Sequence, residues 1–130
     1  MNHGATRILL VDDEPSLLKM MGVYLGRLGY SVTLANSTEK AWAEVEAAPS
    51  GYAMAVLDGS MSGLSMEDLA LRMLRANPSL CVVAASGYAV DTAAMEAAAP
   101  GRVAFLRKPF APEMLAAVVR RMLAAQEEKL

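Results

Sequence analysis

The sequence predicts a single α/β domain in which five parallel strands alternate with five helices that cover both faces of the sheet. Apolar runs of strand length alternate with segments of helical periodicity along the whole chain, the pattern of parallel sheets with crossover helices. The run at residues 53–57 is apolar throughout, as expected for a strand covered on both faces. No linker, charge block or internal repeat divides the 130 residues, a length typical of one domain.

The strands are expected where short apolar runs meet turn residues. They are assigned to residues 7–11, 31–35, 53–57, 80–85 and 103–106. Residues 1–6 read as a lead-in, the domain spans residues 7–125, and residues 126–130 form a tail that is expected to fray.

The first two helices are indicated by apolar spacing and by signals at their ends. Pro15 suits the first turn of a helix, and Gly29 follows the last apolar residue of that segment. Asn36 with Glu39 resembles a capping box, which predicts that Asn36 caps the second helix.

The remaining helices follow the third, fourth and fifth strands. Ser65 with Asp68 forms a capping box for the third helix. The fourth, at about residues 91–99, is rich in Ala and has the weakest apolar face. The last helix follows Pro109 and carries a strong apolar face.

Composition excludes some classes of function. With 12 basic and 14 acidic residues, the chain has no general basic surface for nucleic acid or anionic membrane. Its single cysteine, Cys81, cannot form an internal disulfide. Because neither a signal peptide nor an apolar span near 20 residues is found, a cytoplasmic location is expected.

Polar side chains follow four of the predicted strands. They are Asp12-Asp13, Asp58, Ser86 and Lys108. Each group alone has a simple structural explanation, and Asp58-Gly59 is a common turn pair. The carboxyl ends of parallel strands share one edge of a sheet, so these groups are expected to converge there.

Three carboxylates repel one another unless a cation lies among them, and their oxygen atoms suit Mg²⁺. An Asp nucleophile, a divalent ion, a hydroxyl and an ammonium are the parts needed to accept a phosphoryl group as an acyl phosphate. The alternative is an acidic loop beside a surface lysine.

The motifs at these strand ends resemble the receiver domain of two-component response regulators (CheY-like), and the resemblance covers essentially the whole chain. The motifs are residues 8–14 (ILLVDDE), Leu57-Asp58 with Met61, Ser86-Gly87-Tyr88 and residues 105–110 (FLRKPF). The resemblance implies a flavodoxin-like fold with strand order 2-1-3-4-5. It also implies that Asp58 accepts a phosphoryl group from a phosphohistidine on a sensor histidine kinase or a histidine phosphotransfer protein.

The same resemblance implies a Mg²⁺ site. Asp13, Asp58 and the backbone carbonyl of Ser60 would bind the ion directly, and Asp12 would act through water. Lys108 would contact Asp58 or its phosphoryl oxygens.

It also implies a conformational switch. Ser86 would move inward to bond the phosphoryl group, and Phe105 would change rotamer with it, although Phe105 reads equally well as a partly buried packing residue. The Lys108-Pro109 peptide bond is expected to be cis.

The loop after Asp58 departs from the family pattern. Ser62 stands where the family usually has Pro, and Met66 where it usually has Gly, which should loosen or reroute the loop. Ser60 and Tyr88 occupy positions that in this family tune how quickly the phosphoryl group is lost.

Alternative functions remain open at this point. A haloacid-dehalogenase-type phosphohydrolase also uses an Asp nucleophile and Mg²⁺, but it resembles Asp-x-Asp, and the second acid is here Ser60. The chain could also be a receiver excised from a hybrid sensor kinase, or a scaffold that works without phosphorylation. The main expectation is a phosphoacceptor, not an enzyme, whose last two helices contact a partner or a second copy after phosphorylation.

Overall fold

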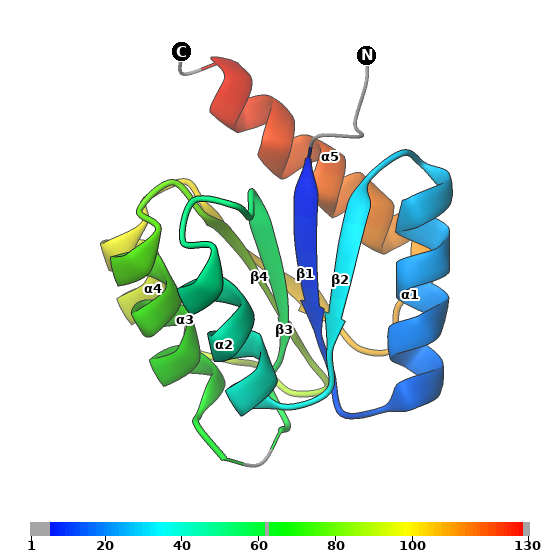
Figure 1. The fold of residues 1–130 in the computed structure, drawn as a ribbon, viewed down its shortest axis with the longest axis horizontal. Helices are drawn as coiled ribbons and strands as arrows, with labels where there is room; N and C mark the ends of the chain where they lie inside the picture. The colour runs from blue at the N-terminus through cyan, green and yellow to red at the C-terminus, as the bar shows by residue number, and fades with distance from the viewer. Residues whose placement is uncertain (1–5, 62, 129–130) are drawn as a thin grey trace.

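The structure is a computed structural model that describes residues 6–61 and 63–128. Five parallel strands form one sheet in the order β2-β1-β3-β4-β5, which confirms the predicted fold class (Figure 1). The strands are β1 (Arg7–Val11), β2 (Ser31–Ala35), β3 (Met54–Asp58), β4 (Cys81–Ser86) and β5 (Val103–Arg107).

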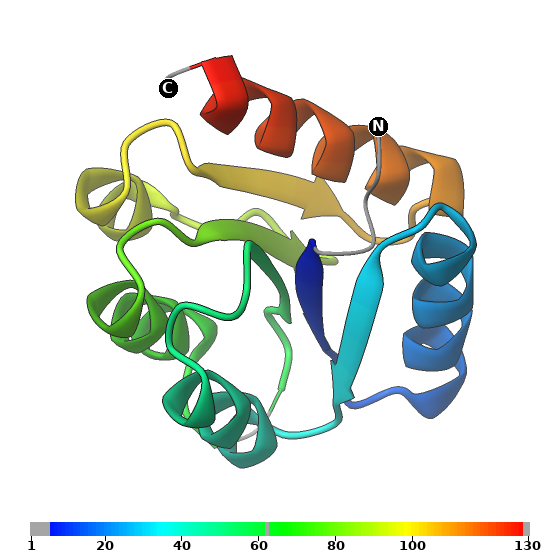
Figure 2. The ribbon, with the colours of Figure 1, turned by 45° about the horizontal axis from the view of Figure 1, so that its top comes forward.

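Helices cover both faces of the sheet, with α1 and α5 on one face and α2, α3 and α4 on the other (Figure 2). They are α1 (Pro15–Arg27), α2 (Thr38–Ala47), α3 (Met66–Ala76), α4 (Ala93–Ala98) and α5 (Pro112–Glu128). Alternate residues of each central strand point to opposite faces, so two separate apolar clusters form. All of β3 and β4 is buried, as their apolar composition predicted.

The polar residues at two strand ends belong to the strands themselves. β3 ends at Asp58, which pairs with Ala85, and the Gly59 amide donates to the Ala85 carbonyl over 2.8 Å. β4 likewise continues to Ser86, one residue beyond the predicted end. Strand hydrogen bonding therefore holds the backbone of Asp58 and Ser86 rigidly.

The cap of α2 corrects the prediction that Asn36 caps this helix. The N-cap is Ser37, whose hydroxyl accepts the backbone N–H of Lys40 over 3.1 Å. Ser37 has the extended backbone that an N-cap requires, and its side chain reaches the free amide of the first turn. The cap of α3 is Ser65, as predicted, because its hydroxyl accepts the Asp68 amide.

This assignment gives a testable difference between two neighbouring residues. Ser37→Ala is expected to lower the free energy of unfolding by about 1 kcal/mol, because it leaves an amide of the first helical turn without a partner. Asn36→Ala should leave that free energy nearly unchanged. Urea denaturation of both variants measures the difference, and a larger loss for Asn36→Ala would contradict the assignment.

Two helix ends differ from the expected boundaries. α5 continues to Glu128, so the segment expected to fray from residue 126 starts as helix. α4 is shorter than the predicted residues 91–99, and Asp91 instead accepts the Ala93 amide in a turn before the helix.

Among the described residues, no helix is long and apolar enough to cross a membrane.

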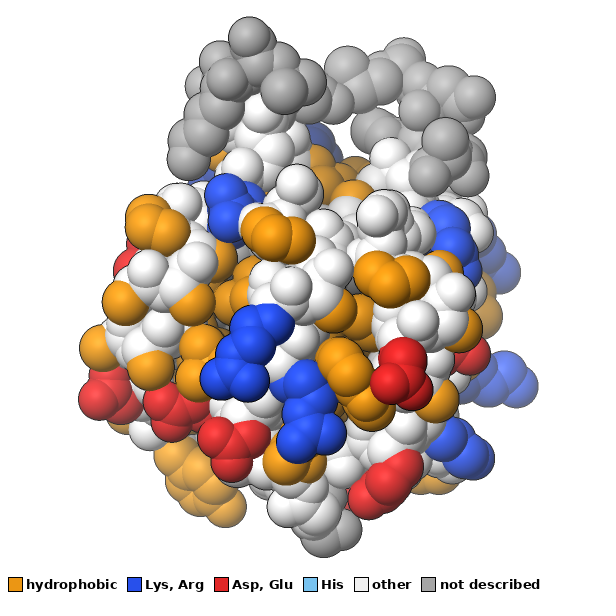
Figure 3. Space-filling view, turned by 60° about the vertical axis from the view of Figure 1, so that its left-hand side comes forward, with side chains coloured by type: hydrophobic (Ala, Val, Ile, Leu, Met, Phe, Trp, Pro, Cys, Tyr) orange, Lys and Arg blue, Asp and Glu red, His pale blue; other side chains and the backbone are white. Residues whose placement is uncertain are grey.

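The face formed by α2, α3 and α4 carries charges of both signs. Figure 3 shows Lys and Arg side chains interspersed with Asp and Glu and with hydrophobic side chains. On this face Arg72 of α3 lies 5.5 Å from the ring centre of Trp42 on α2. Trp42 is partly buried and packs against the core.

Candidate functional site

Asp58 ends β3 in a buried position, with 4 % of its surface exposed. Its Oδ1 accepts the Ser60 amide over 3.1 Å and the Ser60 hydroxyl over 2.9 Å. Its Oδ2 is buried and accepts no hydrogen bond from the described residues. The described residues therefore anchor the carboxylate through one oxygen only.

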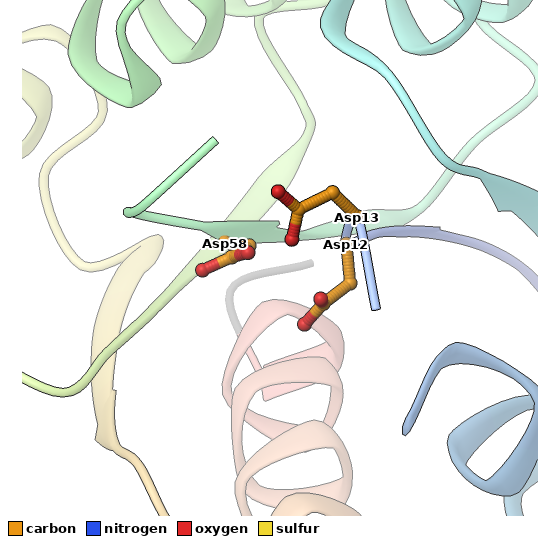
Figure 4. A group of neighbouring side chains, drawn as sticks. All are labelled: Asp12, Asp13 and Asp58. Atoms are coloured by element: carbon orange, nitrogen blue, oxygen red, sulfur yellow. The ribbon is translucent and has the colours of Figure 1, made fainter. Parts of the chain in front are cut away.

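The three acidic side chains that the sequence singled out lie together. Carboxylate oxygens of Asp12, Asp13 and Asp58 are all within 4.8 Å of one another (Figure 4). Asp12 is buried and Asp13 is exposed, so the group opens to solvent on the side of Asp13. Asp12 is held in place by the Glu14 amide, which donates to its Oδ1 over 2.9 Å.

Lys108, which follows β5, reaches into this acidic group. Its Nζ lies 3.1 Å from Oδ1 of Asp58, the contact expected from the family resemblance. It also lies 2.8 Å from Oδ2 of Asp12, a contact that sequence reasoning did not anticipate. The backbone is fixed beside the sheet because the Lys108 amide donates to the Ser86 carbonyl over 2.8 Å, and the next peptide bond, Lys108-Pro109, is cis as expected.

The ion pair shifts the protonation equilibria of both partners. Burial alone would raise the pKa of Asp58, but the Ser60 hydrogen bonds and Lys108 outweigh it and lower the pKa below 3.8. Burial alone would lower the pKa of Lys108, but hydrogen bonds to Asp12 and Asp58 raise the pKa above 10.5. Both groups are therefore charged over the whole neutral range.

The lowered pKa of Asp58 predicts a pH dependence of stability. Because folding favours ionised Asp58, its contribution is fully present above the unfolded value of 3.8 and is lost as pH falls through the lower folded value. Wild type should therefore lose more unfolding free energy than Asp58→Asn between about pH 5 and pH 3. Urea denaturation across this range tests it, and equal losses in both proteins would contradict the prediction.

Ser86 lies beside the Asp58 loop, whereas Phe105 faces outward. Ser86 is 1 % exposed, and its hydroxyl accepts the Tyr88 amide over 3.1 Å. Ser86 also packs closely on Gly59: a Cβ added to Gly59 would lie 3.2 Å from the Ser86 Oγ. Phe105 pairs with Ala84 and is 38 % exposed. Their joint movement stays a prediction.

The loop after Asp58 contains the two departures from the family pattern. Ser62 lies outside the described residues. Met66 begins α3 and packs, partly buried, against the core, so this helix forms without a glycine at that position. Ser60 contacts Asp58 through its amide and its hydroxyl, a side-chain contact that sequence reasoning missed although Ser two residues after Asp is a common turn signal.

A cleft of about 600 Å³ opens beside Lys108. It lies between α1 and the segment after β5, and most of its lining surface is apolar. The lining residues are Glu14, Ser16, Leu17, Met20, Gly87, Lys108, Pro109 and Phe110.

The chain belongs to the response regulator receiver domain family, whose model matches residues 8–120. It is similar to the nitrogen assimilation regulatory protein NtrX of Azorhizobium caulinodans, with 33 % identity over 89 % of this chain and 26 % of the relative. Among solved structures, a CheY-like receiver domain protein from Methanospirillum hungatei superposes with a TM-score of 0.84 and 24 % identity, covering 96 % of this chain and 98 % of the other. A receiver protein from Sinorhizobium medicae gives a TM-score of 0.79 and 27 % identity, covering 94 % and 97 %.

The chain spans about a quarter of the length of curated relatives such as NtrX and the DNA-binding transcriptional regulator NtrC of Rhizobium meliloti. What it shares with them is the receiver domain. This family membership removes the support for a haloacid-dehalogenase-type phosphohydrolase.

Proposed function

We propose that this chain is the phosphoacceptor of a two-component phosphorelay and that Asp58 receives the phosphoryl group. The observation that carries the proposal is the buried Oδ2 of Asp58, which has no hydrogen-bond partner among the described residues and lies within a group of acids beside Lys108. A buried carboxylate oxygen without a donor is costly for a purely structural residue. A nucleophile, by contrast, needs a free oxygen.

The donor set fits Mg²⁺. Carboxylate and carbonyl oxygens are its preferred ligands, and carboxylate oxygens of Asp12, Asp13 and Asp58 lie within 4.8 Å of one another. Asp13, Asp58 and the Ser60 carbonyl would hold the ion, with Asp12 acting through water. When bound, Mg²⁺ supplies positive charge that neutralises the transferring phosphoryl group.

Asp58 and Lys108 have different roles in the transfer of the phosphoryl group. An oxygen of Asp58 attacks the phosphorus of a phosphohistidine, the P–N bond breaks, and its electron pair returns to the donor imidazole. Lys108, already 3.1 Å from Asp58, then faces the phosphoryl oxygens as a point charge. The phosphoryl group stays on the chain's own side chain, so the protein is a phosphoacceptor and not an enzyme acting on a separate substrate.

The donor is a sensor histidine kinase or a histidine phosphotransfer protein in the cytoplasm. The apolar cleft beside Lys108 offers such a partner a surface next to the acceptor. After phosphorylation, Ser86 bonds the new oxyanion and Phe105 turns inward from its exposed position, which changes the surface that the domain presents.

Incubation with acetyl phosphate and Mg²⁺, followed by intact mass measurement, tests the proposal. We expect the mass of one phosphoryl group to be added, and we expect the addition to disappear when EDTA replaces Mg²⁺. No addition to folded wild-type protein would overturn the proposal and favour a scaffold that works without phosphorylation. Circular dichroism on the same samples verifies that the protein is folded.

A further inference from the structure

Two glycines, Gly59 and Gly63, lie at the start and near the end of the loop after Asp58. Here the acceptor loop means residues 59–61 and 63–65. At its start, Gly59 is bound to β4, because its amide donates to the Ala85 carbonyl over 2.8 Å. Near its end, Gly63 has a φ of +91°, which side-chain-bearing residues rarely adopt. Ser60, which holds Asp58, lies between these two points.

Gly63 lies against the first residue of α2. A Cβ on Gly63 would lie 2.8 Å from Oγ1 of Thr38 and 3.2 Å from Oε1 of Glu39. The Glu39 oxygen is the far end of a flexible, exposed side chain and can move away. Thr38 cannot do so easily, because it is β-branched, helical and only 4 % exposed. Thr38 therefore limits the space beside Gly63.

We propose that Thr38 is a positioning residue for phosphorylation. Its side chain sets the position of Gly63 and thereby that of Ser60 in the same loop. The amide and hydroxyl of Ser60 in turn orient Asp58. The inference rests on the proposed function. It assigns a role in the reaction to α2, a helix that contributes no residue to the acidic group. A displacement of about 1 Å in a reacting group slows a reaction up to a hundredfold, so a small shift of this loop is sufficient.

The test is a double-mutant cycle on Gly63 and Thr38. Phosphorylation by acetyl phosphate at saturating Mg²⁺ is timed in wild type, Gly63→Ala, Thr38→Ala and the double variant, and urea denaturation gives their stabilities. Gly63→Ala is expected to slow phosphorylation by about 10- to 100-fold. In the double variant, Thr38→Ala removes the Thr38 atoms that the new Cβ would meet, and phosphorylation should be about tenfold faster than in Gly63→Ala alone. The backbone strain at φ +91° remains, so the loss of stability should persist.

Gly29→Ala is the matched control. Gly29 is also an exposed glycine with positive φ, 99°, but it lies between α1 and β2 at the opposite edge of the sheet. This variant should lose stability as Gly63→Ala does and keep the wild-type rate of phosphorylation.

A second variant fills the space between Thr38 and Gly63 without changing a glycine, so it adds no backbone strain. Thr38→Leu places a larger side chain at position 38 and should slow phosphorylation as Gly63→Ala does. The proposal is overturned if the double variant is as slow as Gly63→Ala, or if Gly63→Ala and Thr38→Leu both keep the wild-type rate. Wild type that takes up no phosphoryl group would overturn the proposed function itself, a different outcome from unequal rates among the variants.

Discussion

Asp58→Asn is expected to abolish the mass gain with acetyl phosphate and Mg²⁺. The amide has the shape of the carboxylate but lacks its negative charge, and an amide oxygen does not form a stable phosphoryl adduct. Oδ2 of Asp58 is buried and accepts no hydrogen bond from the described residues, whereas the neighbouring Asp12 accepts hydrogen bonds from Glu14 and Lys108. Intact mass after incubation measures the result directly.

Glu46→Gln provides the control for this experiment. Glu46 is an exposed acid on α2, and its substitution removes one carboxylate in the same way. It should take up one phosphoryl group at the wild-type rate. A phosphoryl group that still appears on Asp58→Asn would place the acceptor at another residue, and peptide mapping would locate it.

Lys108→Met should raise the affinity for Mg²⁺ by about tenfold or more. In the structure, the Lys108 ammonium lies within 3.1 Å of both Asp58 and Asp12, so it neutralises the same carboxylates that would bind the ion. Methionine keeps much of the apolar length of lysine without its charge. The three acids then lose the ammonium that pairs with Asp12 and Asp58, and a divalent ion is attracted more strongly.

Calorimetric titration with MgCl₂ measures this effect. Lys40→Met serves as the control, because Lys40 is an exposed lysine on α2 whose side chain takes no part in the acidic group. Its affinity for Mg²⁺ should match that of wild type. If Lys108→Met bound Mg²⁺ no more tightly than wild type, the ammonium and the ion would not share the same carboxylates.

Local signals along the chain were sufficient for most of the fold. β1 and β2 begin and end at the predicted residues, α1 begins at Pro15, and Ser65 caps α3. These features depend on apolar periodicity and on turn chemistry within a few residues. The alternation of strands and helices implied a parallel sheet, and the strand order came from the resemblance to receiver domains. Because all parallel strands end at one edge, the convergence of Asp12, Asp13 and Asp58 also followed.

Where two local signals competed, the sequence was not sufficient. Asn36 and Ser37 are both good N-caps, and the choice between them depends on where β2 ends and α2 packs on the sheet. In the structure, Ser37 has the extended backbone, and its hydroxyl accepts the Lys40 amide.

The sequence by itself determined which chemical groups meet at the edge of the sheet, and the tertiary structure decided which atoms touch. Lys108 and Asp12 are 96 residues apart, and their contact requires the register of every intervening strand. The lack of a hydrogen bond from the described residues to Oδ2 of Asp58 likewise depends on how distant segments pack, and so does the limited space between Gly63 and Thr38. Residue types and spacing set the chemistry that is available, because they are properties of the chain. Distances of about 3 Å between side chains arise only from close packing of the whole domain.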